Sequence, residues 1–120
     1  MKQLIAALLI AWMAAAESAS VTFYTGNELM DLCKGTAPGD SNTNIDRYNQ
    51  CVIYLAGVID SEDFVSGVND TKHIVCMPER TSVIQLQRVF VKYMEASPEI
   101  WHETAAGHAL VAFRRAWPCP

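Results

Sequence analysis

The chain has 120 residues, a length that suits one domain of moderate size. After the first sixteen residues, eight Lys and Arg stand against thirteen Asp and Glu, so the remainder carries a formal charge of −5. An acidic surface repels nucleic acid and anionic lipid, which argues against both as partners. The roughly 100 residues of this remainder can bury somewhat under two thirds of their unfolded surface, so the core is thin.

The start of the chain is typical of a secretory signal peptide. Lys2 is followed by an apolar run over residues 4–16 and then by small and polar residues. That run is shorter than the about 20 apolar residues that a membrane-crossing helix needs, which disfavours an anchor. We predict a signal peptide over residues 1–19, cleaved between about 16 and 20, and a single helical domain over residues 20–120.

All four cysteines lie after the apolar run. An even number of cysteines in an oxidising compartment predicts two disulfides. Zinc is the alternative, but the successive cysteines are 18, 25 and 43 residues apart, too far for two ligands from one turn. Disulfides are therefore favoured for Cys33, Cys51, Cys76 and Cys119.

A capping box predicts the start of the first helix. Thr25 can accept a hydrogen bond from the backbone of Glu28, whose side chain can reach back to the backbone of Thr25. Apolar residues follow at helical spacing, and the stretch 35–42, which contains Gly and Pro, then breaks the pattern. We expect a short helix that ends near Cys33, followed by an exposed connection.

A second helix is predicted from about Asn44 to Asp60. Its apolar residues recur every three or four positions and therefore share one face. Glycine inside a helix costs about 1 kcal/mol relative to alanine, so we expect a neighbouring helix to approach closely at Gly57. The periodicity fades after Asp60, which predicts a loop over residues 60–70 with one helical turn at most. The inward side chains are expected to be Ile45, Tyr48, Val52, Leu55 and Ile59.

Two further helices follow. A second capping box, Ser82 with Gln85, predicts a helix that stops before Pro98, a residue that lacks the amide donor and can equally begin the next segment. The last helix is expected from Thr104 to Trp117. The inward side chains are expected to be Val83, Leu86, Phe90, Tyr93 and Met94 in the third helix and Ala106, Leu110, Phe113 and Trp117 in the fourth.

Together these elements predict an all-α fold, a small four-helix domain stapled by two disulfides. Cys33 ends the first helix and Cys51 lies early in the second, so an antiparallel hairpin brings them together. Cys76 precedes the third helix and Cys119 follows the fourth, and these ends are neighbours if the two helices are antiparallel. Among the three possible pairings we therefore prefer Cys33–Cys51 with Cys76–Cys119.

The sequence offers no convincing catalytic constellation. The segment from His102 to His108 looks like the H-E-x-x-H zinc helix, but its histidines are six residues apart and face different sides of a helix. The thiols are all expected in disulfides, which leaves no nucleophile. Glu62 and Asp63 are interpreted as solvated charges and His73 as a surface residue. We predict that the protein is not an enzyme and uses no metal or cofactor.

A binding role remains. Binding residues are often carried by loops on rigid scaffolds, and an apolar anchor inside a polar rim is typical of an interaction surface. Phe64 could serve as such an anchor, or it could fold back onto the core. The candidate partner-binding residues are Asp60, Glu62, Asp63, Phe64, Val65 and Asp70.

Several motifs follow one another along the chain. They are Phe23-Tyr24-Thr25-Gly26-Asn27-Glu28-Leu29, Cys51, Tyr54-Leu55-Ala56-Gly57-Val58-Ile59-Asp60, Cys76-Met77-Pro78-Glu79, Val91-Lys92-Tyr93-Met94-Glu95, Pro98, His102, Ala105-Ala106 and Ala116-Trp117-Pro118-Cys119. In this order they resemble the Rap/Tai family of type VI secretion immunity proteins over nearly the whole chain after the signal peptide. Trp117 stands where that family commonly has Phe, and Met77 where it commonly has Ile or Leu, both mild apolar changes.

The resemblance implies a periplasmic helical protein, often a homodimer, without enzyme activity. Such a protein binds a peptidoglycan-cleaving amidase or endopeptidase toxin, occludes its active site and so protects the producing cell. The stretch from Phe64 to Asp70 matches no motif of the family, so the resemblance leaves open which toxin is recognised.

Two other functions fit a small, exported, disulfide-bonded helical chain. A periplasmic acid-stress chaperone has this size and fold class, but such proteins usually carry a single disulfide and bind unfolded clients. An inhibitor of host lysozyme differs from a toxin antidote only in whose hydrolase is bound.

Overall fold

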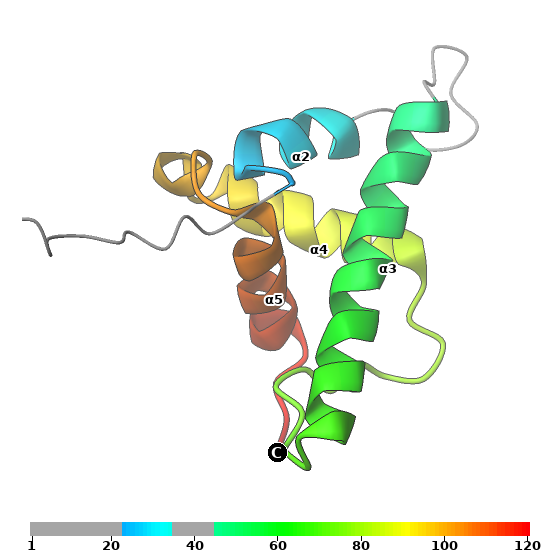
Figure 1. Ribbon diagram of the computed structural model, residues 1–120. Coiled ribbons are helices and arrows are strands. Elements are labelled where there is room, and N and C mark those ends of the chain that lie inside the picture. Colours follow the sequence, from blue (N-terminus) through cyan, green and yellow to red (C-terminus); the bar gives the residue numbers. More distant parts are fainter. Residues whose placement is uncertain (1–22, 35–44) are drawn as a thin grey trace, which may run out of the picture.

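The computed structural model describes residues 23–34 and 45–120 (Figure 1). Within these residues the chain is helical, which confirms the predicted all-α fold. The predicted signal peptide and the connection over residues 35–42 lie outside the described residues. The elements are α2 (Gly26–Cys33), α3 (Ile45–Val68), α4 (Val83–Glu95), the 3-10 helix η1 (Pro98–Ile100) and α5 (Ala105–Ala116).

Both predicted capping boxes are present. At α2 the Thr25 amide donates to Glu28 Oε2 at 2.8 Å, and the Glu28 amide donates to Thr25 Oγ1. At α4 the Ser82 amide donates to Gln85 Oε1 at 2.7 Å, and the Gln85 amide donates to Ser82 Oγ. These bonds satisfy backbone donors that have no partner within the helix, which fixes where each helix begins.

The core lies where α2, α3, α4 and α5 meet. Figure 1 shows α3 and α5 side by side, with α4 crossing behind both and α2 lying beside the first turns of α3. Ile45 and Val83 were expected to point inward, but they are exposed because they stand at the first positions of α3 and α4. The largest fully buried side chains are Leu29, Met30, Leu55, Phe90, Met94 and Phe113.

A close backbone approach occurs at Gly26 and not at Gly57. The Gly26 amide donates to the carbonyl of Glu103 at 2.8 Å, and a methyl group on Gly26 would lie 2.8 Å from the carbonyl oxygen of Trp101. A methyl group on Gly57 would meet no atom within 4 Å. The prediction for Gly57 was wrong because that glycine lies on the exposed side of α3.

The preferred disulfide pairing is confirmed. Cys33 is bonded to Cys51, with their Cα atoms 5.0 Å apart, and Cys76 is bonded to Cys119, with their Cα atoms 4.9 Å apart. The first bridge joins the end of α2 to α3. The second joins the segment that precedes α4 to the C-terminal end of the chain, where the Cys76 amide also donates to the carbonyl of Trp117 at 2.9 Å.

The predicted loop over residues 60–70 was wrong, because α3 continues to Val68. Ser61 does not interrupt the helix, since its hydroxyl donates to the Gly57 carbonyl one turn earlier at 2.7 Å. The helix ends where the Asn69 amide donates back to Val65 and Asp70 adopts a positive φ of 52°. The apolar periodicity fades after Asp60 because this part of α3 buries a polar residue, Ser66, while its apolar residues Phe64, Val65 and Val68 are exposed.

Candidate functional site

A groove opens between the C-terminal half of α3 and the start of α5. It encloses about 500 Å³ and is walled by apolar side chains of both helices, among them Val58, Val65 and Leu110. A smaller hollow of about 370 Å³ adjoins it and reaches Tyr54. The two share Val58, Ser61 and Ala106, so they form one continuous depression along α3.

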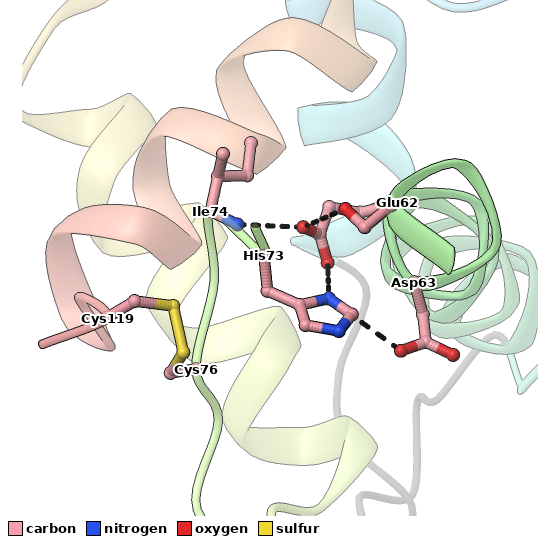
Figure 2. Close-up of polar contacts among 7 residues, drawn as sticks. Glu62, Asp63, His73, Ile74, Cys76 and Cys119 are labelled. Carbon is pink, nitrogen blue, oxygen red and sulfur yellow. Dashed lines mark hydrogen bonds and ion pairs between the residues drawn. A yellow bond between two sulfur atoms is a disulfide. The ribbon is translucent and has the colours of Figure 1, made fainter. Parts of the chain in front are cut away.

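The third wall of the groove is the segment that follows α3, including Thr71, Lys72 and Ile74. Figure 2 shows how Glu62 fastens this segment to the helix. The Ile74 amide donates to Glu62 Oε1 at 2.8 Å, and His73 Nδ1 lies 3.4 Å from Glu62 Oε2. One carboxylate thus holds two successive residues of the segment against α3, and the Thr71 amide adds a hydrogen bond to the Ser66 carbonyl at 3.0 Å.

The Glu62 carboxylate is well ordered by its neighbours. Its side chain is only 8% exposed, and Ser66 donates a further hydrogen bond to Oε1 at 3.1 Å. Burial raises the pKa of Glu62, but the bonds from Ile74, His73 and Ser66 together with the charge of His73 outweigh burial and lower this pKa below its usual value. The interpretation of Glu62 as merely solvated charge was wrong.

The same segment is held at its far end by the Cys76–Cys119 disulfide, visible in Figure 2. Asp63 adds a weaker contact, with Oδ1 3.8 Å from His73 Nδ1, and its side chain is 78% exposed. His73 is half exposed, as expected, yet it pairs with both acids. The groove wall is thus anchored at both ends, by the Glu62 contacts and by a covalent bond.

Beside the groove, α3 presents an exposed apolar stripe, here called the α3 ridge, made of Ile53, Phe64 and Val68. Their exposed fractions are 70%, 68% and 65%. Separations of 11 and 4 residues put the three side chains on one face of the helix. Phe64 therefore does not fold back on the core. The ridge and the groove together give this side of α3 an exposed and largely apolar face.

The structure brings most of the candidate binding residues to this face. Glu62 and Val65 line the groove, Phe64 belongs to the ridge, and Asp60 is exposed on the same stretch of α3. Asp63 points toward His73, and Asp70 follows the end of the helix.

Most of the residues that line the groove were not foreseen as binding residues, including its apolar residues Val58, Ile74, Ala106 and Leu110. Ala106 and Leu110 were expected in the core; the fully buried positions are instead their neighbours Ala105 and Ala109, while Leu110 is partly buried and packs against the core as well as lining the groove. The sequence does contain a signal for this groove wall, because apolar residues occupy two adjacent faces of the predicted last helix and not one.

Reactive chemistry is not evident at this face. Glu62 lines the groove, but His73, which contacts Glu62, is not among the lining residues, and neither is any cysteine. His108 pairs with Glu103 at 2.8 Å, and His102 is exposed. Across residues 23–34 and 45–120, no three His, Cys, Asp or Glu side chains gather as a metal site would require.

The family model of the Rap1a immunity proteins matches residues 25–119. The chain belongs to this family. The matched range includes both disulfides, the α3 ridge and the groove. A comparison with curated proteins finds no match. An immunity role follows from membership of the Rap1a family.

Proposed function

We propose that this Rap1a immunity protein is a periplasmic antidote to a type VI secretion effector that cleaves peptidoglycan, an amidase or endopeptidase. It binds the effector, blocks its active site and so protects the producing cell. The observation that carries the proposal is the pairing of an exposed apolar ridge with a groove on a helical scaffold cross-linked by two disulfides. Exposed apolar faces of this kind are typical of protein-binding sites.

A periplasmic location is part of the proposal. The two disulfides fit an oxidising compartment. The expected signal peptide over residues 1–19 would deliver the chain there. No helix in the described parts of the chain is long and apolar enough to span a membrane.

The antidote acts by stoichiometric binding and not by catalysis. Binding residues are expected at Asp60, Glu62, Asp63, Phe64, Val65 and Asp70, the part of α3 that lines or adjoins the groove. The homodimer implied by the resemblance would use another surface of the chain.

The test uses the peptidoglycan hydrolase encoded beside this chain. The hydrolase is exported to the periplasm of a heterologous host, with and without the full-length chain, and survival is counted while a pulldown records the complex. We expect the chain to restore survival and to co-purify with the hydrolase. Lysis despite abundant oxidised chain, with no complex recovered, would contradict the proposal and would direct attention to the chaperone alternative.

A further inference from the structure

We infer that the part of the effector seated on the α3 ridge and groove is a polypeptide segment with an apolar anchor side chain flanked by basic residues. This inference rests on the proposed function and adds to it the chemistry of the partner. The inference is based on the hydrogen bonds that the polar atoms in the groove already make and on the charges around the groove.

Ser61, Glu62 and Ser66, three of the polar side chains that line the groove, already have hydrogen-bond partners within the protein. The Ser61 hydroxyl donates to the Gly57 carbonyl at 2.7 Å, and the Ser66 hydroxyl donates to Glu62. Both oxygens of Glu62 are engaged, one by the Ile74 amide and the other by His73. An apolar occupant therefore covers these groups without leaving them unpaired. Removing water from them then costs little free energy.

The size and lining of the groove fit an apolar anchor. Its volume of about 500 Å³ lies within the range of about 300–1,000 Å³ that is usual for ligand sites. Val65 and Ile74 are 52% and 43% exposed, so a side chain that enters between them and Leu110 removes apolar surface from water. Each Å² of apolar surface buried in this way contributes about 25 cal/mol.

The surroundings of the groove are acidic. Four acidic residues and one lysine lie between positions 60 and 72, which gives this stretch a formal charge of −3. Glu62 is engaged inside the wall, whereas Asp60, Asp63 and Asp70 are exposed. Basic groups on both sides of the anchor complement these charges and accelerate association.

The same charges disfavour a second copy of the chain on this face. A two-fold contact is isologous, so Asp60 and Asp70 of one copy would lie near the same acidic patch of the other. Like charges placed together across an interface oppose association. A hydrolase that acts on a polymer rich in carboxylates, in contrast, has reason to carry cations near its substrate cleft.

The experiment measures association and dissociation rates of the oxidised chain with the neighbouring hydrolase, at low salt and at about 1 M salt. Asp60→Lys is compared with Glu79→Lys, which reverses an exposed charge outside the face. Ala106→Phe fills the groove from α5 and is compared with Ala116→Phe at an exposed position of the same helix. Circular dichroism and thiol counting verify that each variant is folded and oxidised.

We expect Asp60→Lys to slow association about tenfold at low salt and to lose this effect at about 1 M salt, where the Debye length is about 3 Å. Ala106→Phe should weaken binding about 30-fold, mainly through faster dissociation. Both controls should match the parent chain.

Tight binding that neither Asp60→Lys nor Ala106→Phe alters would overturn the inference while leaving the proposed function intact. Sedimentation of the chain alone adds a second check. If Ala106→Phe converts a dimer into a monomer, the groove holds a second copy and the inference fails. If the hydrolase is active but does not bind the parent chain, the proposed function fails and the inference falls with it.

Discussion

Replacing Glu62 with Ala should loosen the groove wall without unfolding the domain. The change removes the acceptor of the Ile74 amide, at 2.8 Å, and of the Ser66 hydroxyl, at 3.1 Å, together with the partner of His73. Hydrogen bonds to a charged group contribute about 1.5–3 kcal/mol each, but water can reach the partly exposed Ile74 and replace part of that. Because alanine has a higher helix propensity, the substitution also regains up to about 0.7 kcal/mol in the free energy of unfolding. We therefore expect a loss of about 2 kcal/mol in the free energy of unfolding.

Two assays check this value. Urea denaturation of the oxidised domain gives the free energy of unfolding, and hydrogen exchange followed by mass spectrometry reports on residues 70–75. A local loss of about 2 kcal/mol accelerates amide exchange about 30-fold in that segment.

The control for this prediction is Asp63→Ala. Asp63 lies next to Glu62 on α3, but its side chain is 78% exposed and its only contact with the wall spans 3.8 Å. Surface pairs of this kind contribute about 0–1 kcal/mol, so exchange in the wall should hardly change. The reasoning is refuted if Glu62→Ala costs no more than Asp63→Ala and leaves the exchange of residues 70–75 unchanged.

Three further predictions concern stability, each checked by denaturation. Gly26→Ala should lose about 1–3 kcal/mol, because its methyl group would lie 2.8 Å from a backbone oxygen, whereas Gly57→Ala should gain up to about 1 kcal/mol; equal effects would contradict the packing described. Replacing Cys76 and Cys119 with serine should cost about 4 kcal/mol for a separation of 43 residues, and a cost below 1 kcal/mol would be inconsistent with this estimate. The pKa of Glu62 is lowered from its usual value of 4.5, so its contribution is complete above pH 4.5 and is lost as pH falls through the lowered pKa. The free energies of unfolding of the parent chain and of Glu62→Gln should therefore converge in strong acid. A difference between them that increases in strong acid would contradict the lowered pKa of Glu62.

Local sequence signals predicted the helix starts and the disulfides well. The capping boxes at Thr25 and Ser82 depend on residues three positions apart, and such contacts are specified by the sequence itself. The cysteine pairing followed because each bridge joins helix ends that an antiparallel arrangement brings together.

The exposed apolar face of α3, the proposed binding face, could be predicted only in part. Six candidate residues were named, and they do cluster at the C-terminal half of α3, but as a helix and the turn after it. Periodicity failed there because Phe64 and Val68 are apolar and exposed while Val65 lines the groove, so no single stripe stands out. The residues of a binding surface fit the partner and not the core of their own chain. The sequence pattern of one chain therefore does not distinguish apolar residues of a binding surface from apolar residues of the core.

The groove wall was beyond the reach of sequence patterns. It depends on contacts between Glu62 and residues 11 and 12 positions later, across a turn whose course is set by Asp70 at positive φ. The opposite wall comes from Leu110 on another helix. Such contacts arise only once the helices have packed.

A titration of peptidoglycan hydrolysis tests the central claim most directly. The neighbouring hydrolase is held at fixed concentration while the oxidised chain is added, in parallel with Phe64→Ser on the α3 ridge and Ile84→Ser at an exposed position of α4. We predict that the parent chain and Ile84→Ser abolish hydrolysis at one chain per hydrolase, whereas Phe64→Ser binds about 30-fold more weakly, measured as its apparent inhibition constant, the loss expected for a central apolar anchor. Full hydrolysis in the presence of excess parent chain would contradict the antidote function, and equal titration by all three proteins would contradict its assignment to the α3 ridge.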